Sequence, residues 1–406
     1  MSGNPWEDRI AQQAERVRGT LIATRRDFSM HPELSDEEAR TAQVIAGRLQ
    51  ALGLAVETDV GGGHGVVGML QGARPGPVVA YRADMDALPV QDALEAPYRS
   101  LVLGVKHACG HDAHVSIALG VAEVLTALRE DLAGAVKFIF QPAEESLDGA
   151  RAMIEAGVLE SPAPEAILAL HVFPVPAGKV GIAQGVCLAG MDEFRVRLYS
   201  PAGNLAALMA KAASALCSIS TGEVPTGPAA FDALVRSMQS GDAQSRTILV
   251  SCWPYAVEPS QDSHLLGLVS ATTPVLRRRV HRQIRQTLDA VTAEMGATYD
   301  LSYTFFNPPL INDADVVAQV LPVLERILGP ENVLRFQAPY PFAHEDFALY
   351  LQYAPGALFW LGIANPEKGI TSMLHAPAFD VDEEALVVGT RVMAAVLWRF
   401  LEERGR

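Results

Sequence analysis

The sequence predicts an α/β protein with a smaller α+β domain inserted into it, and three observations support this prediction. Segments with helical and strand-like patterns alternate in the first half of the chain, as expected of a sheet with helices on its faces. From Glu193 to Tyr199 the pattern becomes strictly alternating, which is typical of a sheet with one solvated face. After Pro308 the α/β pattern resumes. A length of 406 residues also exceeds one ordinary core, so two domains are expected.

The first elements are expected to be two helices. Asn4 is predicted to be an N-cap and Pro5 the first residue of a helix that runs toward Phe28. Ser35 and Glu38 have the spacing of a capping box for the second helix, and a glycine at position 53 is expected to end it.

The remaining elements of the large domain follow from apolar periodicity and β-branched content. Helices are expected at Asp112–Leu128, from about Asp313, and at Asp382–Glu403. The expected strands are Val66–Leu70, Pro77–Arg82, Ala135–Phe140, Ala166–Val172 and Ala357–Gly362. We therefore predict a mixed sheet flanked by helices, built from residues 1–188 and 309–406.

The inserted domain, residues 189–308, shows the order strand, helix, strand, strand, helix, strand. This order is typical of a ferredoxin-like α+β fold. The elements are expected at Glu193–Tyr199, Leu205–Ile219, Thr247–Cys252, Leu265–Ala271, Val275–Met295 and Thr298–Phe306.

Composition excludes several classes of partner. The net charge of −15 argues against nucleic acid or an anionic membrane, because their phosphates require Lys and Arg. No apolar run approaches the roughly 20 residues of a membrane helix, so a cytoplasmic location is expected. The four cysteines are widely spaced and do not form a disulfide pattern. Only Cys109 stands between histidines.

The densest chemical signal is His107-Ala-Cys-Gly-His-Asp-Ala-His114. Cys109 and His111 are separated by a glycine, so a looped backbone can direct both toward one centre. A thiolate and an imidazole suit zinc, manganese or cobalt-type ions. Asp112 and His114, at the start of the next helix, could orient such ligands. The alternative is a histidine-rich helix cap that binds no metal.

Two adjacent carboxylates, Glu144 and Glu145, follow an apolar strand in the segment Gln141-Pro-Ala-Glu-Glu145. Open α/β sheets place their sites at the carboxyl ends of strands. Because neighbouring side chains cannot face one metal equally, we expect one to bind metal and the other to transfer protons. The alternative is a solvated acidic loop.

Asp84 and His171 are predicted to end two further strands, so three strand ends converge on one edge of the sheet. His375 lies in a loop far along the chain. Taken alone, a histidine such as His171 is more often a satisfied core residue than a ligand, and His375 is a weaker signal still. The convergence is what favours a single site.

These residues lie in stretches that resemble the amidohydrolase branch of the aminoacylase/carboxypeptidase metallopeptidases. The stretches span nearly the whole large domain, and the Cys-Gly-His-Asp and Pro-Ala-Glu-Glu motifs are specific. They are Arg26-Asp-Phe28, His31-Pro-Glu-Leu34, Tyr81-Arg-Ala-Asp-Met-Asp-Ala-Leu-Pro89, Gly104-Val-Lys-His-Ala-Cys-Gly-His-Asp-Ala-His114, Phe138-Ile-Phe-Gln-Pro-Ala-Glu-Glu145, Leu170-His-Val172, Glu345-Asp-Phe347 and His375.

The resemblance implies a metal-dependent enzyme that hydrolyses the amide bond of a small N-acyl amino acid or a related amide. It implies two divalent ions (Mn²⁺, Zn²⁺, Co²⁺ or Ni²⁺), a lid formed by the inserted domain, and a homodimer through that lid. Glu144 would be the general base and Asp84 would orient a ligand. The implied metal ligands are Cys109, His111, Glu145, His171 and His375.

The inserted domain departs from the family pattern. The family carries a histidine after the first lid strand, whereas the matching segment here, Tyr199–Ala207, has none. The family's Asn-x-Ile-Pro element and a nearby arginine are also missing around Ala256–Ala271. The candidate substrate contacts are therefore His114, His264 and His344. His264 could instead be a surface strand residue, and His344 could simply pack.

Two alternative functions follow from this departure. One is a hydrolase with the same site chemistry that acts on an aryl amine or another unusual C–N substrate. The other is a non-catalytic metal-binding relative, which the intact Glu144 and ligand positions argue against.

Overall fold

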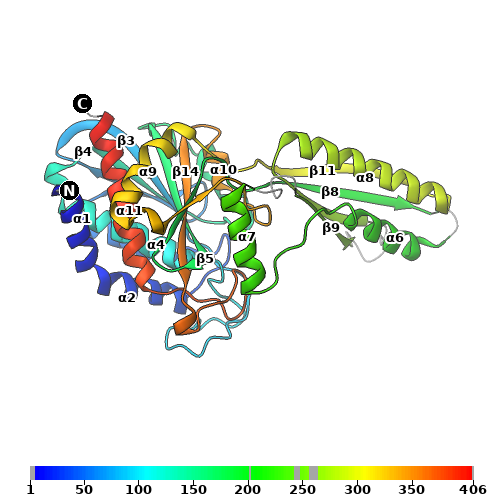
Figure 1. Ribbon diagram of the computed structural model, residues 1–406, viewed down its shortest axis with the longest axis horizontal. Coiled ribbons are helices and arrows are strands. Elements are labelled where there is room, and N and C mark those ends of the chain that lie inside the picture. Colours follow the sequence, from blue (N-terminus) through cyan, green and yellow to red (C-terminus); the bar gives the residue numbers. More distant parts are fainter. Residues whose placement is uncertain (1–4, 201–202, 242–246, 256–263, 405–406) are drawn as a thin grey trace.

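Two separate sheets organise the chain in the computed structural model (Figure 1), which describes residues 5–200, 203–241, 247–255 and 264–404. The larger sheet has eight strands in the order β1 (Ala55–Val60), β2 (Gly65–Gln71), β4 (Ala133–Gln141), β3 (Arg74–Asp84), β5 (Ala166–Pro176), β14 (Gly356–Ala364), β6 (Val180–Ala183), β13 (Val333–Phe336). A short pair, β7 (Gly185–Val186) and β12 (Ile311–Asn312), lies apart.

The large sheet is mixed, as predicted. Its central strands β4, β3, β5 and β14 are parallel, whereas β1, β2 and the β14–β6 pair are antiparallel. The central strands are almost wholly buried because helices cover both faces of the sheet. This burial explains why the strands appear in the sequence as continuous apolar runs.

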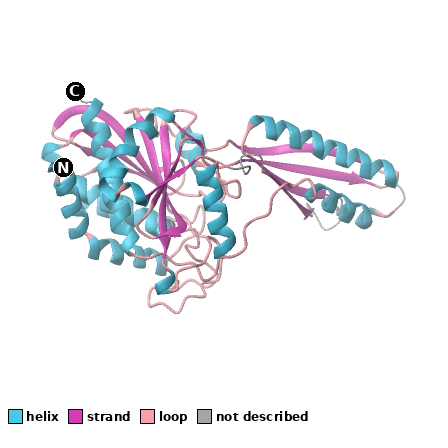
Figure 2. Cartoon of the chain, in the orientation of Figure 1, coloured by secondary structure: helices cyan, strands magenta, loops and turns pink. Residues whose placement is uncertain are grey.

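One face of the large sheet carries most of its helices. A single apolar core lies between these helices and this face of the sheet, and it includes Trp6, Leu21, Val121 and Trp398. The helices of this layer are α1 (Pro5–Arg16), α2 (Arg18–Met30), α3 (Ala39–Ala51), α4 (His111–Ala127), α9 (Ala314–Leu328) and α11 (Glu384–Arg404). The opposite face is covered by α5 (Gly149–Glu155), α7 (Pro228–Ser240) and α10 (Phe347–Tyr350) (Figure 2).

Strand register places the predicted site residues level with one another. Arg82 of β3 pairs with Ala169 of β5, so Asp84 is level with His171, and Asp84 pairs directly with Gln141 of β4. The prediction that His171 ends its strand is wrong, because β5 continues to Pro176. The convergence holds nevertheless, because register rather than strand length aligns these residues.

Two predictions near the amino terminus need correction. The helix expected toward Phe28 is interrupted at Val17, where α1 gives way to α2. The predicted N-cap, Asn4, lies outside the described residues. The capping box does not form: the Ser35 hydroxyl donates to Asp86 (2.7 Å), and Glu38 accepts from the Ala143 amide (2.8 Å). Both side chains are used for tertiary contacts instead.

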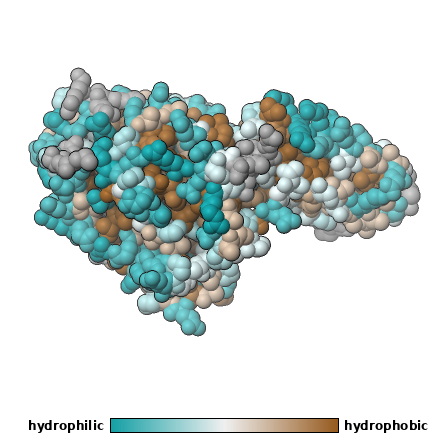
Figure 3. Space-filling model, viewed as in Figure 1, coloured by the Kyte–Doolittle hydropathy of each residue, from teal (hydrophilic) through white to brown (hydrophobic). Residues whose placement is uncertain are grey.

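The inserted segment forms the predicted ferredoxin-like domain. Its antiparallel sheet has the order β11 (Thr298–Asn307), β8 (Gly190–Tyr199), β10 (His264–Ala271), β9 (Ile248–Tyr255). Two helices, α6 (Leu205–Cys217) and α8 (Pro274–Met295), share a core with the sheet. This domain projects from the large one, so the molecule is elongated with a narrow waist (Figure 3).

Helix α7 was not predicted, and it lies on the large domain although it belongs to the inserted segment (Figure 1). Its buried residues Phe231, Leu234 and Met238 join the core that covers the second face of the large sheet. The amides of Gln337 and Ala338 both donate to the Met238 carbonyl (2.8 and 3.0 Å). Helix α7 therefore docks on the large domain, although α6 before it and β9 after it belong to the small one.

Candidate metal centre

Tight backbone turns bring the predicted site residues into position. Gly110 has φ +85°, and a Cβ there would lie 2.5 Å from a Val172 methyl, so only glycine fits between Cys109 and His111. The two adjacent carboxylates follow Ala143, which has φ +55°. His375 has φ +63°, and its amide donates to Ala108 (2.8 Å). Strained backbone of this kind concentrates at functional sites.

The five predicted ligand residues form one connected cluster at the sheet edge. The Cys109 sulfur lies 3.5 Å from Nε2 of His171 and 3.3 Å from Nε2 of His375. The Glu145 carboxylate lies 3.8 Å from Nε2 of His111 and 3.7 Å from Nε2 of His375. One thiol and one carboxylate thus connect three imidazoles, and this arrangement can serve two ions.

The donor atoms fit metal ions. Nε2 of His111 and Oε1 of Glu145 are buried without any hydrogen-bond partner, an arrangement that is costly unless a cation satisfies them. The opposite nitrogens are occupied: Nδ1 of His111 faces the Asp86 carbonyl (2.9 Å), and Nδ1 of His171 faces the Val172 carbonyl (2.7 Å). These contacts turn both Nε2 atoms toward the centre, as outer hydrogen bonds do for metal-binding histidines.

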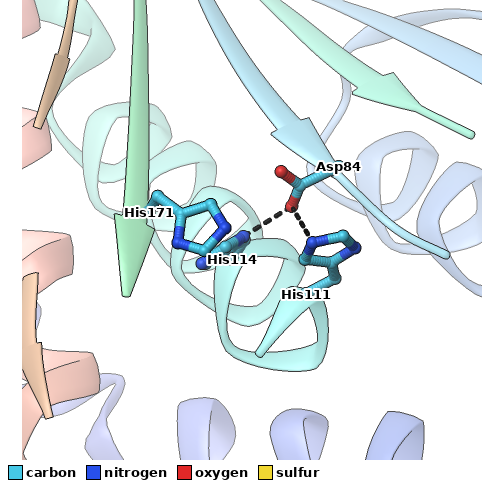
Figure 4. A group of neighbouring side chains, drawn as sticks. All are labelled: Asp84, His111, His114 and His171. Atoms are coloured by element: carbon cyan, nitrogen blue, oxygen red, sulfur yellow. Dashed lines mark hydrogen bonds and ion pairs between the residues drawn. The ribbon is translucent and has the colours of Figure 1, made fainter. Parts of the chain in front are cut away.

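Asp84 and His114 lie behind the ligands (Figure 4). Oδ1 of Asp84 is 2.5 Å from Nδ1 of His114 and 3.9 Å from Nε2 of His111. Nε2 of His114 accepts from the Val172 amide (2.8 Å), so both of its ring nitrogens are engaged. The prediction that His114 contacts substrate does not fit this position, because the side chain is fully buried and donates to Asp84.

Glu144 lies beside the donor cluster, with Oε2 3.9 Å from Nε2 of His111. Burial, followed by the charges of Glu345 and Glu145, raises the pKa of Glu144 well above its usual value. A carboxylate with a raised pKa is a stronger base than an ordinary carboxylate, and a cation bound at the neighbouring donor atoms would lower that pKa again.

Sequence reasoning missed the role of Arg82. Its buried guanidinium contacts Asp84 (2.6 Å), Glu345 (3.0 Å) and Asp346 (2.8 Å). The signal was a cationic residue in the buried, mostly apolar half of β3. Asp86 follows the same strand, and its role was not predicted either: it contacts His111, and its carboxylate accepts from the Glu145 amide (2.9 Å). Its signal was the Asp-Met-Asp spacing after the strand.

A cavity of about 380 Å³ opens in front of the cluster. It is lined by Cys109, Glu144 and His375, and by residues of both domains. His344 lines it, with Nε2 2.7 Å from the Ser270 hydroxyl of the small domain.

His264 is not among the described residues that line this cavity. It begins β10, four residues or about 13 Å along the strand from Leu268, which does line the cavity. The family-specific segments of the lid fall partly on residues 201–202 and 256–263, outside the described residues.

Comparisons with known proteins agree with this geometry. The model of peptidase family M20/M25/M40 matches residues 80–399, most of the chain. The chain belongs to this family. It is accordingly a metal-dependent hydrolase of amide C–N bonds, and the resemblance inferred from its motifs is confirmed.

Relatives match over nearly the full length of the chain. N-acetylcysteine deacetylase of Bacillus subtilis (strain 168) is 33% identical over 94% of this chain and 97% of its own. IAA-amino acid hydrolase ILR1-like 6 of Arabidopsis thaliana is 33% identical over 98% of this chain and 83% of its own. Among solved structures, the chain is similar to the YxeP protein of Bacillus subtilis, a dinuclear metal-binding peptidase of the M20 family. The two are 29% identical over 96% of this chain and 99% of YxeP, with a TM-score of 0.75.

Metal binding should stabilise the fold. Ions that bind the folded chain at 100 times their dissociation constant add about 2.7 kcal/mol. Differential scanning fluorimetry should therefore show a lower Tm after chelation, restored by Mn²⁺ or Zn²⁺. Cys109→Ala should lose metal and show little of this shift. An unchanged Tm after complete removal of metal would contradict the assignment of these ligands.

Proposed function

We propose that this amidohydrolase cleaves small N-acyl amino acids or related amides, with Glu144 as the proton-transfer group. The observation that carries the proposal is the position of Glu144, which lines the cavity beside the donor cluster. In the proposal Cys109, His111, Glu145, His171 and His375 hold two divalent ions, Mn²⁺, Zn²⁺, Co²⁺ or Ni²⁺.

Each group then has a defined task. Bound divalent ions polarise the amide carbonyl and lower the pKa of a water molecule from about 16 toward neutrality. Glu144 takes the proton of the attacking water and gives it to the leaving nitrogen when the C–N bond breaks. Asp86 positions His111 through Nδ1, Asp84 positions His114, and Arg82 holds Asp84 in place.

The two domains have different roles in this proposal. Residues 1–188 and 309–406 form the catalytic domain, and residues 189–308 form a lid, of which α7 stays docked on the catalytic domain. His344 joins the two parts through Ser270 and is the proposed substrate contact. A homodimer through the lid and a cytoplasmic location remain predictions. Among the described helices, none is long and apolar enough to cross a membrane.

A second candidate is hydrolysis of an aryl amine or another C–N substrate at the same site. The rebuilt lid favours it, because the family's histidine is missing from the segment Tyr199–Ala207. A non-catalytic metal-binding role is the third possibility, and the presence of Glu144 and of all five ligand positions argues against it.

A panel of N-acyl amino acids and simple amides tests the proposal, with the chain loaded in turn with each of the four ions. We expect turnover of at least one amide that disappears on chelation. Failure to hydrolyse any amide with two ions firmly bound would contradict the proposal and leave the second and third possibilities.

A further inference from the structure

His344 stands between the lid and the cavity in front of the metal centre. Its ring lines that cavity, and its Nε2 lies 2.7 Å from the hydroxyl of Ser270 on strand β10 of the lid. Ser270 itself is not among the described residues that line the cavity. The lid therefore occupies one ring nitrogen of His344, and Nδ1 is the nitrogen that remains for a molecule in the cavity.

The backbone around His344 is held from both domains. On the lid side, the side-chain amide of Asn307 at the end of β11 donates to the Glu345 carbonyl (3.1 Å). On the other side, the Arg82 guanidinium contacts the carboxylates of Glu345 (3.0 Å) and Asp346 (2.8 Å). The segment that carries His344 is thus fixed at both ends, and the ring keeps a defined place at the edge of the cavity.

The hydrogen bonding of Ser270 indicates which nitrogen of His344 carries the proton. Burial lowers the pKa of His344 to about 4, so the ring is neutral at neutral pH and has a single N–H. The Ser270 hydroxyl is buried and has no other partner among the described residues, so donation to Nε2 is what satisfies its proton. The ring proton then lies on Nδ1.

Nδ1 of His344 is free to bind a molecule in the cavity. No described residue bonds it, and it is not one of the sealed polar atoms that lack a partner, so it is accessible. Three lining residues, Glu144, Glu145 and Glu345, carry carboxylates, which accept hydrogen bonds but cannot donate when ionised. The carbonyl oxygen of an amide needs a donor, and a neutral N–H is its complement.

We propose that His344 is a catalytic residue whose Nδ1–H donates to the carbonyl oxygen of the scissile amide, and that Ser270 is the positioning residue that sets its tautomer. This inference rests on the proposed amide hydrolysis and names a further residue of that site. The hydrogen bond strengthens as negative charge develops on the oxygen, in addition to the effect of the bound ions. His344 transfers no proton, so the role of Glu144 is unchanged.

Kinetics of variants on an amide that the metal-loaded wild type hydrolyses test both roles. His344→Phe keeps a flat ring without nitrogen and should lower kcat about 10²-fold, as loss of one donor to a developing oxyanion does. His344→Asn places an amide donor near the position of Nδ1 and should recover roughly tenfold of that loss. Ser270→Ala should lower kcat about tenfold, with a change of about threefold or less in KM. Wild-type kcat in His344→Phe would overturn the proposal.

A double-mutant cycle and two controls locate the effect. Ser270→Ala should have no further effect on kcat in the His344→Phe background, because the serine acts only through the ring. Independent, additive losses would contradict this coupling. Ser251→Ala, at an exposed serine of the neighbouring strand β9, is the matched control and should leave kcat unchanged. Tyr340 also lines the cavity, and a larger loss in Tyr340→Phe than in His344→Phe would move the donor role to that hydroxyl.

Nitrogen-15 NMR of the zinc-loaded protein separates this inference from the proposed function, because it needs no turnover. The His344 ring, assigned by comparison with His344→Phe, should be protonated on Nδ1, and Ser270→Ala should shift it toward the Nε2-protonated tautomer. If no amide is turned over, the proposed function fails, whereas the tautomer and its dependence on Ser270 still decide the positioning. A wild-type ring protonated on Nε2, or an unchanged tautomer in Ser270→Ala, would refute the proposal.

Binding to zinc-loaded Glu144→Gln tests the contact with the amide itself. An amide that calorimetry shows to bind this variant should shift the Nδ1 and N–H resonances of His344 as it saturates the site. Saturation without any change in these resonances would show that His344 does not touch the amide, and the catalytic role would be wrong.

Discussion

Glu144→Gln should reduce kcat for amide hydrolysis by about 10²- to 10⁴-fold while metal content stays unchanged. Glutamine is nearly isosteric with glutamate but cannot accept the proton of the attacking water. The proposed ligands Glu145 and His111 are untouched, so the ions should remain bound. Steady-state kinetics with elemental analysis of the same preparation measures both properties.

The control for this variant is Glu130→Gln, which removes an exposed carboxylate and should leave kcat and metal content as they are. If Glu144→Gln kept most of its activity, the proton-transfer assignment would be wrong. If it lost its metal, Glu144 would be a ligand, and the division of labour between Glu144 and Glu145 would have to be reversed.

Arg82→Met should destabilise the protein by roughly 3–5 kcal/mol. The guanidinium is fully buried and is shared by Asp84, Glu345 and Asp346, so its removal leaves three carboxylates without their cation. Methionine keeps much of the aliphatic volume, and the loss is therefore electrostatic. The midpoint of denaturant unfolding measures the effect.

Arg326→Met is the matched control, because Arg326 is half-exposed and pairs with Glu7 at the surface (2.9 Å). Such pairs contribute about 1 kcal/mol or less. Equal destabilisation by the two substitutions would show that the buried network around Arg82 is not what holds this edge of the sheet together.

The position of the site could be predicted from the sequence because parallel strands align their ends. Asp84 and Glu144 follow apolar strands, and neighbouring parallel strands bring them to one edge. The predicted strand ended earlier than β5 does, but His171 was still placed at the correct edge, because strand register rather than strand length sets its position. His375 could be assigned only through the family resemblance, because a lone histidine in a loop carries no pattern of its own.

Other features depend on contacts that sequence patterns do not encode. The capping-box spacing of Ser35 and Glu38 is local, but Asp86 and Ala143 bind these side chains instead. Helix α7 has an ordinary amphipathic pattern, and nothing in that pattern states which domain its apolar face will cover. The engagement of both nitrogens of His114 likewise depends on Asp84 and Val172, residues distant in the sequence.

Metal titration of the stripped protein tests the central claim most directly. The chain is freed of metal by chelation, Mn²⁺ or Zn²⁺ is added in known equivalents, and hydrolysis of an amide is followed at each step. The two-ion site predicts no turnover without metal and a rise that levels off at two equivalents per chain. Full activity in the metal-free protein, or saturation at one equivalent, would contradict it.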